Sequence, residues 1–227
     1  MPSRFEPFVN ESYYHIFNKT IDNKDVFSSK NNIDEFKQRM QYYRSTKANT
    51  SFSLLPRLGK ASSENLSVDI SLEKYFRVDI LAYYLMPNHY HLVLQQKVDN
   101  GTSNFISKLV NSFTRNFNLK TERKGQIFLK DFKAVSIKTD EQLLHTVRYV
   151  HLNGFSSRLD KTFGEMINKR SLHAAYLGLG NDQLVNTSKV LTYFNNDLES
   201  YKNFILDRAD YQRSLEDLKY IIKHDEE

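Results

Sequence analysis

Two hydrophobic periods divide the chain into expected strands and helices. Four short segments are apolar-rich or alternate apolar and polar residues, which predicts β-strands. Three longer segments repeat apolar residues every three or four positions, which is typical of amphipathic helices. The expected strands are residues 12–19, 75–85, 89–96 and 132–138, and the expected helices are residues 31–43, 104–121 and 140–152.

The order of these elements predicts the fold. Strand, helix, strand, strand, helix, strand is the order of a ferredoxin-like βαββαβ antiparallel sheet, so the expected class is α+β. A further helix over residues 140–152 follows the fourth strand, and domain 1–155 contains all of these elements. Residues 156–227 are expected to form a separate helical C-terminal appendage, because residues 188–194, 200–207 and 215–223 are short amphipathic segments.

One segment shows neither the alternation of a strand nor the apolar spacing of a helix. Residues 45–71 are rich in Ser, Asn and Lys and contain Pro56 and Gly59. This composition is typical of a connection without regular structure, so we expect an inserted, mobile loop here.

Composition narrows the class of protein. The 227 residues are 40% hydrophobic and 13% aromatic, which is sufficient for a packed core. Cysteine is absent, which excludes a disulfide scaffold, a thiolate zinc site and cysteine catalysis. The N-terminal residues do not resemble a signal peptide, and no segment approaches the ~20 apolar residues of a membrane span. We therefore expect a cytoplasmic protein without a membrane partner.

Basic residues gather in one region of a chain whose formal net charge is +5. They cluster around the end of the 104–121 helix and the fourth strand, and Phe128 and Phe132 lie among them. Cations beside aromatic rings suit single-stranded nucleic acid, in which phosphates and bases are both accessible. A solvated helix end beside core phenylalanines explains the same pattern equally well. The clustered residues are Lys120, Arg123, Lys124, Lys130 and Lys133.

Two histidines stand two positions apart on the third expected strand. His89 and His91 therefore project from the same face, ~7 Å apart along the strand. Their imidazoles could converge on one divalent ion, which would still need at least one further ligand. The alternative is that both are ordinary strand histidines.

The last expected helix carries a tyrosine outside its buried stripe. Tyr149 lies away from the aliphatic face, and Asn153 follows one turn later on the same side. A phenol outside the core is either a surface aromatic or a nucleophile. Spacing alone does not select one of fourteen tyrosines as a nucleophile. The aliphatic face is formed by Leu143, Leu144, Val147 and Val150.

Several blocks in order resemble one family. The segment Leu85–Val93, LMPNHYHLV, resembles the HUH signature of the single-tyrosine, IS200-like transposases. Four blocks match in order over roughly residues 12–155, and two later blocks resemble the REP-associated tyrosine transposase branch. The other blocks are Tyr14–Lys19, Lys124–Phe128 followed by Phe132 and Lys133, Arg148–Asn153, Ser171–Gly178 and Tyr201–Phe204.

The resemblance implies roles for named residues. It places Tyr149 at the nucleophile position, and His89, His91 and Asn153 at the metal ligands, with Mg²⁺ or Mn²⁺ as the expected ion. The implied activity is cleavage and rejoining of single-stranded or hairpin DNA through a 5′-phosphotyrosine link. The expected DNA contacts are His15, Asn18, Lys19, Lys108, Arg115, Lys120, Arg123, Lys124, Lys130, Lys133 and Arg148.

Departures and alternatives accompany the resemblance. Asp131 stands where many relatives have arginine, which removes a positive charge, and Gly154 stands where many have proline. A domesticated protein that binds hairpin DNA or RNA without cutting it is one alternative. A metal-dependent phosphoesterase that uses water is another. The resemblance allows a monomer or a homodimer.

Overall fold

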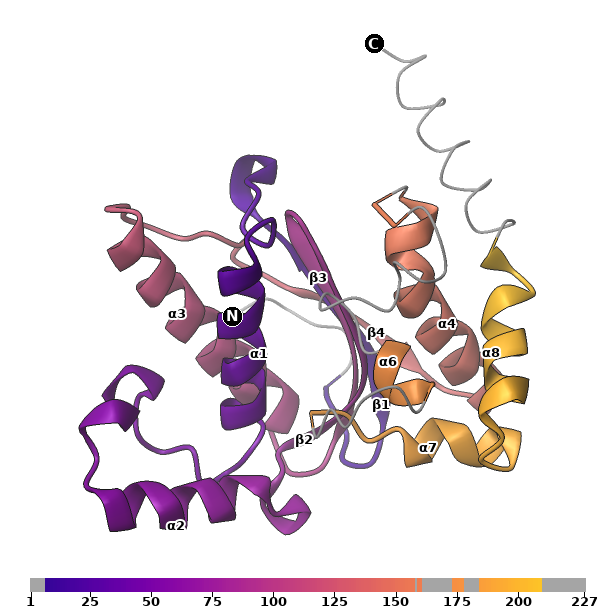
Figure 1. The fold of residues 1–227 in the computed structure, drawn as a ribbon, viewed down its shortest axis with the longest axis horizontal. Helices are drawn as coiled ribbons and strands as arrows, with labels where there is room; N and C mark the ends of the chain where they lie inside the picture. The colour runs from indigo at the N-terminus through magenta and orange to yellow at the C-terminus, as the bar shows by residue number, and fades with distance from the viewer. Residues whose placement is uncertain (1–6, 158, 161–172, 178–183, 210–227) are drawn as a thin grey trace.

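A four-stranded antiparallel sheet forms the centre of the fold, with helices on both faces (Figure 1). The computed structural model describes residues 7–157, 159–160, 173–177 and 184–209. The strand order β2-β3-β1-β4 is that of a ferredoxin-like sheet, which confirms the predicted fold class. The strands are β1 (Tyr13–Lys19), β2 (Val78–Met86), β3 (His89–Gln96) and β4 (Lys133–Ile137).

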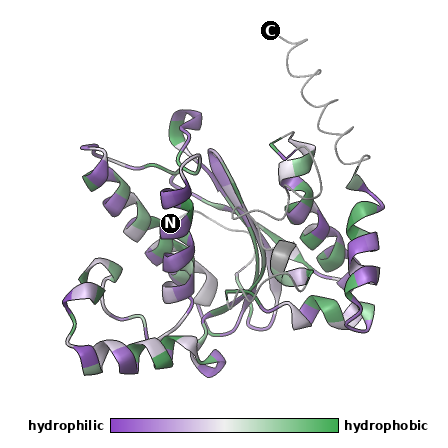
Figure 2. Ribbon diagram, viewed as in Figure 1, coloured by the Kyte–Doolittle hydropathy of each residue, from purple (hydrophilic) through white to green (hydrophobic). Residues whose placement is uncertain are grey.

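One face of the sheet is covered by α1 (Lys30–Tyr43) and α3 (Gly101–Lys120). Alternate residues of β1, including Ile16, are buried on this side, while their neighbours face the other way. Aromatic rings fill the core, and Phe36 and Phe113 pack edge to face. Figure 2 shows hydrophobic and hydrophilic residues alternating along these helices, as amphipathic packing requires.

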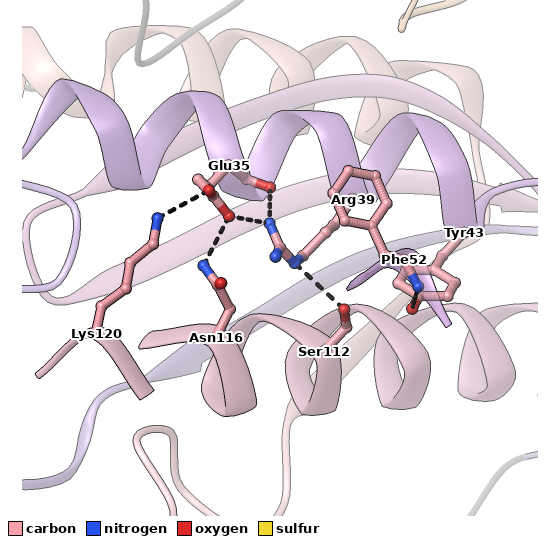
Figure 3. A network of polar contacts seen from close by, with 7 residues as sticks. All are labelled: Glu35, Arg39, Tyr43, Phe52, Ser112, Asn116 and Lys120. Atoms are coloured by element: carbon pink, nitrogen blue, oxygen red, sulfur yellow. Dashed lines mark hydrogen bonds and ion pairs between the residues drawn. The ribbon is translucent and has the colours of Figure 1, made fainter. Parts of the chain in front are cut away.

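A polar network joins α1 to α3 at the edge of this core (Figure 3). The Glu35 carboxylate accepts hydrogen bonds from Asn116 Nδ2 at 2.8 Å and Lys120 Nζ at 2.9 Å, and it pairs with Arg39. Arg39 Nε also donates to Ser112 Oγ at 3.2 Å. Because Arg39 is buried with partners for its charge, the network fixes the two helices without leaving an unpaired cation.

The opposite face of the sheet is covered by α4 (Asp140–Ser156) and by the helices that follow it (Figure 1). Thr139 caps α4 by accepting a hydrogen bond from the Gln142 amide at 3.1 Å. The aliphatic residues of α4, Val147 and Val150 among them, pack against the sheet in a second core. The later helices are α6 (His173–Tyr176), α7 (Ser188–Leu191) and α8 (Leu198–Leu206).

The predicted loop over residues 45–71 is wrong for much of its length. It contains the 3-10 helix η2 (Phe52–Arg57) and the twelve-residue helix α2 (Lys60–Ser71). Leu66 and Ile70, one turn apart, pack partly against the α1–α3 core. Only these two aliphatic residues of α2 pack against the core. Its Ser-rich sequence therefore shows too weak a helical period to predict the helix. The other 3-10 turns are η1 (Ile21–Asn23), η3 (Glu73–Tyr75) and η4 (Thr192–Phe194).

The expected appendage is helical in its described part but not separate. Tyr176 and Tyr201 are fully buried in the same core as α4 and the sheet. Lys189 forms an ion pair with Asp79 of β2 at 2.6 Å. The sequence pattern could not show this, because the contacts depend on residues far apart along the chain. The predicted helix over residues 215–223 lies outside the described residues. None of the described helices is both long and apolar enough to cross a membrane.

Helix α4 is longer than predicted and crosses the expected domain boundary. It continues to Ser156, and the chain then turns back so that the Asp160 amide donates to the Gly154 carbonyl at 2.9 Å. Gly154 is buried where Tyr84 Oη donates to Asp160 Oδ2 at 2.7 Å. A Cβ on residue 154 would overlap both of these side-chain oxygens.

Gly154→Ala should therefore destabilise the fold, although alanine is the better helix former. Displacing a buried tyrosine and breaking its hydrogen bond should cost about 2–4 kcal/mol, more than the ~1 kcal/mol that alanine gains in a helix. Thermal unfolding measures the difference. Gly59→Ala is the matched control, because a Cβ at Gly59 meets no atom within 4 Å. An unchanged melting temperature for Gly154→Ala would show that Tyr84 and Asp160 move aside without cost.

Candidate catalytic site beneath helix α4

Three histidines from two neighbouring strands lie together on the sheet face that α4 covers. His89 and His91 come from β3, and His15 comes from β1 beside them. The ring centroids of His15 and His91 are 5.1 Å apart, and those of His89 and His91 are also 5.1 Å apart. The odd-numbered positions of β1 share this face because the even-numbered positions are buried on the other side.

Tyr149 lies against this histidine cluster from the α4 side. Its ring centroid is 5.9 Å from that of His15 and 5.7 Å from that of His91, and both contacts are edge to face. The aliphatic stripe of α4 is turned into the core, so Tyr149 at its margin is half-buried beside the sheet. The structure therefore brings the expected nucleophile to an expected metal ligand.

The three histidines are neutral near pH 7. Burial lowers the pKa of His15 to about 4. Burial, together with the nearby charge of Lys19, lowers the pKa of His89 to about 4. Burial also lowers the pKa of His91 well below its usual value, and His15 and His89 add to the effect. Neutral imidazoles keep a lone pair, which is the state in which histidine binds a metal.

The C-terminal end of α4 lies near the turn between β2 and β3, where His89 begins β3. Ser157 Oγ donates to the Asn153 carbonyl at 2.7 Å and lies 3.9 Å from Met86 Sδ, and Met86 pairs with His89 across the hairpin. Asn153 is buried, and its side-chain Nδ2 has no hydrogen-bond partner among the described residues. Two neutral imidazoles fit a divalent ion, and Asn153 would join them through Oδ1, because its Nδ2 carries no free lone pair. Within the same residues, no group of three or more His, Cys, Asp or Glu side chains could hold one.

Part of the chain matches a known protein family. Residues 60–153 match the family model described as Transposase IS200 like. This region belongs to the IS200-like transposase family. Its match includes both histidines of β3, Tyr149 and Asn153. No curated protein matches the sequence.

One solved structure is similar in fold to this chain. The structure of a REP-associated tyrosine transposase bound to a REP hairpin is similar over 82% of this chain and 98% of that chain, with a TM-score of 0.54 at 11% identity. The tRNA(His) guanylyltransferase from Saccharomyces cerevisiae covers 92% of this chain and 82% of its own, with a TM-score of 0.30 at 9% identity. The second value is too low to indicate a common fold.

Four of the predicted DNA contacts lie beside the histidine cluster or on the segment that leads to β4. Lys19 is exposed and pairs with His89 in the sheet, and Lys133 is exposed and pairs with Phe17. Lys124 and Lys130 are exposed on the segment that leads to β4, where the Leu129 amide donates to the Lys19 carbonyl at 2.9 Å. Arg123 is half-buried and bonds to Asn118 Oδ1 and the Gln126 carbonyl.

Two of the residues predicted to contact DNA form hydrogen bonds inside the protein. Asn18 is buried, donates from Nδ2 to the Leu129 carbonyl at 3.0 Å, and accepts from the Lys19 amide. Arg148 is buried, donates to the Phe204 carbonyl at 3.3 Å, and stacks on the Phe204 ring. Both side chains therefore have partners inside the protein, and a DNA contact for either residue stays a prediction. The sequence pattern did not indicate these partners, because most of them come from distant segments.

Three further predicted contacts lie across the sheet from Tyr149. Lys108, Arg115 and Lys120 belong to α3, which covers the opposite face (Figure 1). Lys108 and Arg115 line a pocket of about 300 Å³ beside α1, and Lys120 pairs with Glu35. The structure therefore does not bring these cations to the histidine cluster.

Two residues of the site were not singled out by the sequence. The Phe17 ring stacks on His91 at 5.6 Å between centroids and lies 5.0 Å from His15. Asn88 Oδ1 lies 2.7 Å from His89 Nδ1. Phe17 could have been predicted, because it lies two positions after His15 on β1 and side chains at that spacing share a face.

Proposed function

We propose that this transposase cuts and rejoins single-stranded or hairpin DNA through a covalent 5′-phosphotyrosine link on Tyr149. The observation that carries the proposal is the position of Tyr149, edge-on to His15 and His91 on the face that also bears His89. A phenol next to neutral metal-binding side chains suits phosphoryl transfer, because nucleophile and ion can act on the same phosphate.

His89, His91 and Asn153 would hold the divalent ion, Mg²⁺ or Mn²⁺. When bound, the ion would neutralise charge on the scissile phosphate. The support for this set is its chemistry: two neutral imidazoles, and a buried asparagine that would bind the ion through Oδ1. Two imidazoles and one amide leave coordination positions open for the phosphate.

The covalent step exchanges one phosphoester for another. Tyr149 Oη attacks the phosphorus in line, the bond from phosphorus to the 3′-oxygen breaks, and the phenol loses its proton as the departing 3′-oxygen gains one. The DNA 5′-phosphate is then esterified to tyrosine, and a free 3′-hydroxyl is released. Another 3′-hydroxyl can reverse the step on a new strand without ATP, which is why a side-chain nucleophile suits strand transfer.

The DNA strand would pass along the edge of the site where exposed cations gather. Lys19 and Lys133 stand beside the cluster, and Lys130 lies on the adjoining segment. Each would pair with a phosphate and position the strand without selecting its sequence. A hairpin substrate is supported by the similar REP-associated transposase, whose structure holds a REP hairpin. Arg123 and Lys124 extend the same basic surface, while the cations of α3 would meet only a more distant part of the DNA.

Incubation of the chain with labelled single-stranded and hairpin DNA and Mn²⁺ tests the proposal. The expected product is a DNA–protein adduct that survives denaturing electrophoresis, together with a shortened strand that ends in a 3′-hydroxyl. Binding without cleavage would identify a domesticated binder. Cleavage without an adduct would identify a phosphoesterase that uses water. Either result would overturn the proposal.

A further inference from the structure

Both proposed histidine ligands have a hydrogen-bond partner at the same ring nitrogen. His89 Nδ1 lies 2.7 Å from Asn88 Oδ1, and His91 Nδ1 lies 2.9 Å from His15 Nε2. Among the described residues, neither His89 Nε2 nor His91 Nε2 has such a partner. Each ring is thus held in place through Nδ1, which leaves Nε2 available to bind a ligand.

The chemistry of the partners assigns the protons. An amide oxygen only accepts hydrogen bonds, so His89 Nδ1 carries the proton and its Nε2 keeps the lone pair. The His15–His91 contact allows either nitrogen to donate. If His91 Nδ1 donates to His15 Nε2, His91 Nε2 also keeps its lone pair, and His15 carries its own proton on Nδ1. Only this arrangement leaves both Nε2 atoms able to bind a metal.

We propose that Asn88 and His15 are positioning residues that fix the tautomers of His89 and His91, so that both present an unprotonated Nε2 to the ion. The inference rests on the proposed metal-dependent function. It replaces the predicted DNA contact of His15 with a role inside the protein. Metal-binding histidines commonly donate their other N–H to a group that orients the ring, and such partners matter because they select the tautomer and raise ligand basicity.

His15 acts through His91 and not as a third ligand. Its Nε2 is occupied by the contact with His91, and its ring is packed between Phe17 at 5.0 Å and Tyr149 at 5.9 Å. The described residues contain no group of three or more histidine, cysteine or acidic side chains that could hold a metal. Neutral imidazole in water favours the proton on Nε2, so without an acceptor at Nδ1 the unproductive tautomer would predominate at each ligand.

Nitrogen-15 NMR of the metal-free full chain tests the assignment directly, because the two nitrogens of a neutral histidine differ in chemical shift with the tautomer. The wild-type chain should carry the proton on Nδ1 at His89 and His91. His15→Phe keeps a ring of similar size but removes the acceptor, so His91 alone should shift toward the Nε2-protonated form. Asn88→Ala should shift His89 alone. The exposed His145 supplies the control His145→Phe, which should change neither ring.

Metal affinity gives the second readout. Titration with Mn²⁺, followed by electron paramagnetic resonance, should show about 10- to 100-fold weaker binding for His15→Phe and for Asn88→Ala. Asn88→Asp and His15→Gln retain an oxygen acceptor and should recover most of the affinity. Recovery by these variants separates tautomer control from damage to packing, as does retention of the wild-type melting temperature.

The outcomes distinguish two failures. Unchanged tautomers together with unchanged Mn²⁺ affinity in His15→Phe and Asn88→Ala would overturn the positioning roles while leaving the metal site intact. Direct coupling of Mn²⁺ to nitrogen-15 of His15 would overturn them as well, by making His15 a ligand. A wild-type chain that binds no Mn²⁺ would instead overturn the metal site of the proposed function, and the positioning roles with it.

Discussion

Tyr149→Phe should abolish the covalent link to DNA, with a loss of roughly 10⁴- to 10⁶-fold in the rate of adduct formation, which is the range expected when a nucleophile is removed. The substitution deletes one oxygen and leaves the ring that packs against His15 and His91. The fold, the metal site and DNA binding should therefore be retained. Denaturing electrophoresis of labelled DNA after incubation with Mn²⁺ measures the adduct, and a filter-binding titration measures DNA affinity.

Tyr193→Phe is the control for this experiment. Tyr193 is 43% exposed on the 3-10 helix η4, so its variant should form the adduct at the wild-type rate. An adduct that persists in Tyr149→Phe would show that another of the fourteen tyrosines, or another nucleophile, attacks the phosphate. Loss of DNA binding along with the adduct would point to a structural role for the phenol.

The double substitution of His89 and His91 by alanine should abolish metal binding, with a loss of Mn²⁺ affinity greater than about 100-fold, because removing a ligand costs more than removing the group that orients it. Adduct formation should fall with it, while DNA binding to the lysines at the edge of the site should remain. Chelation of the metal in the wild-type chain should give the same loss, reversed by added Mn²⁺. Both histidines are neutral, so no buried charge is left unpaired by the change.

His145→Ala serves as the control, because His145 is exposed on the outer side of α4. His91→Gln, which fills more of the buried space, guards against a loss caused by a cavity alone. Wild-type Mn²⁺ affinity in the double variant would contradict the ligand assignment. Normal adduct formation without metal would contradict the metal's part in the reaction.

The sequence determined much of the fold, because local periodicity reports on burial. The hairpin of β2 and β3, the helix α3 and most of α4 follow from alternation and helical spacing. His89 and His91 share a face because side chains two positions apart on a strand point the same way. Helix α2 escaped prediction because its inner side carries few aliphatic residues, so its pattern resembles that of a loop.

Only the tertiary structure decided which chemistry-bearing residues meet. Lys19 and Asn18 are adjacent in sequence, but one lies beside His89 and the other is buried beneath Leu129. His15 and His91 are 76 positions apart, and their hydrogen bond exists only because β1 pairs with β3. The physical reason is that local patterns record which face of an element is buried, whereas the partner at that face is set by strand register and helix packing.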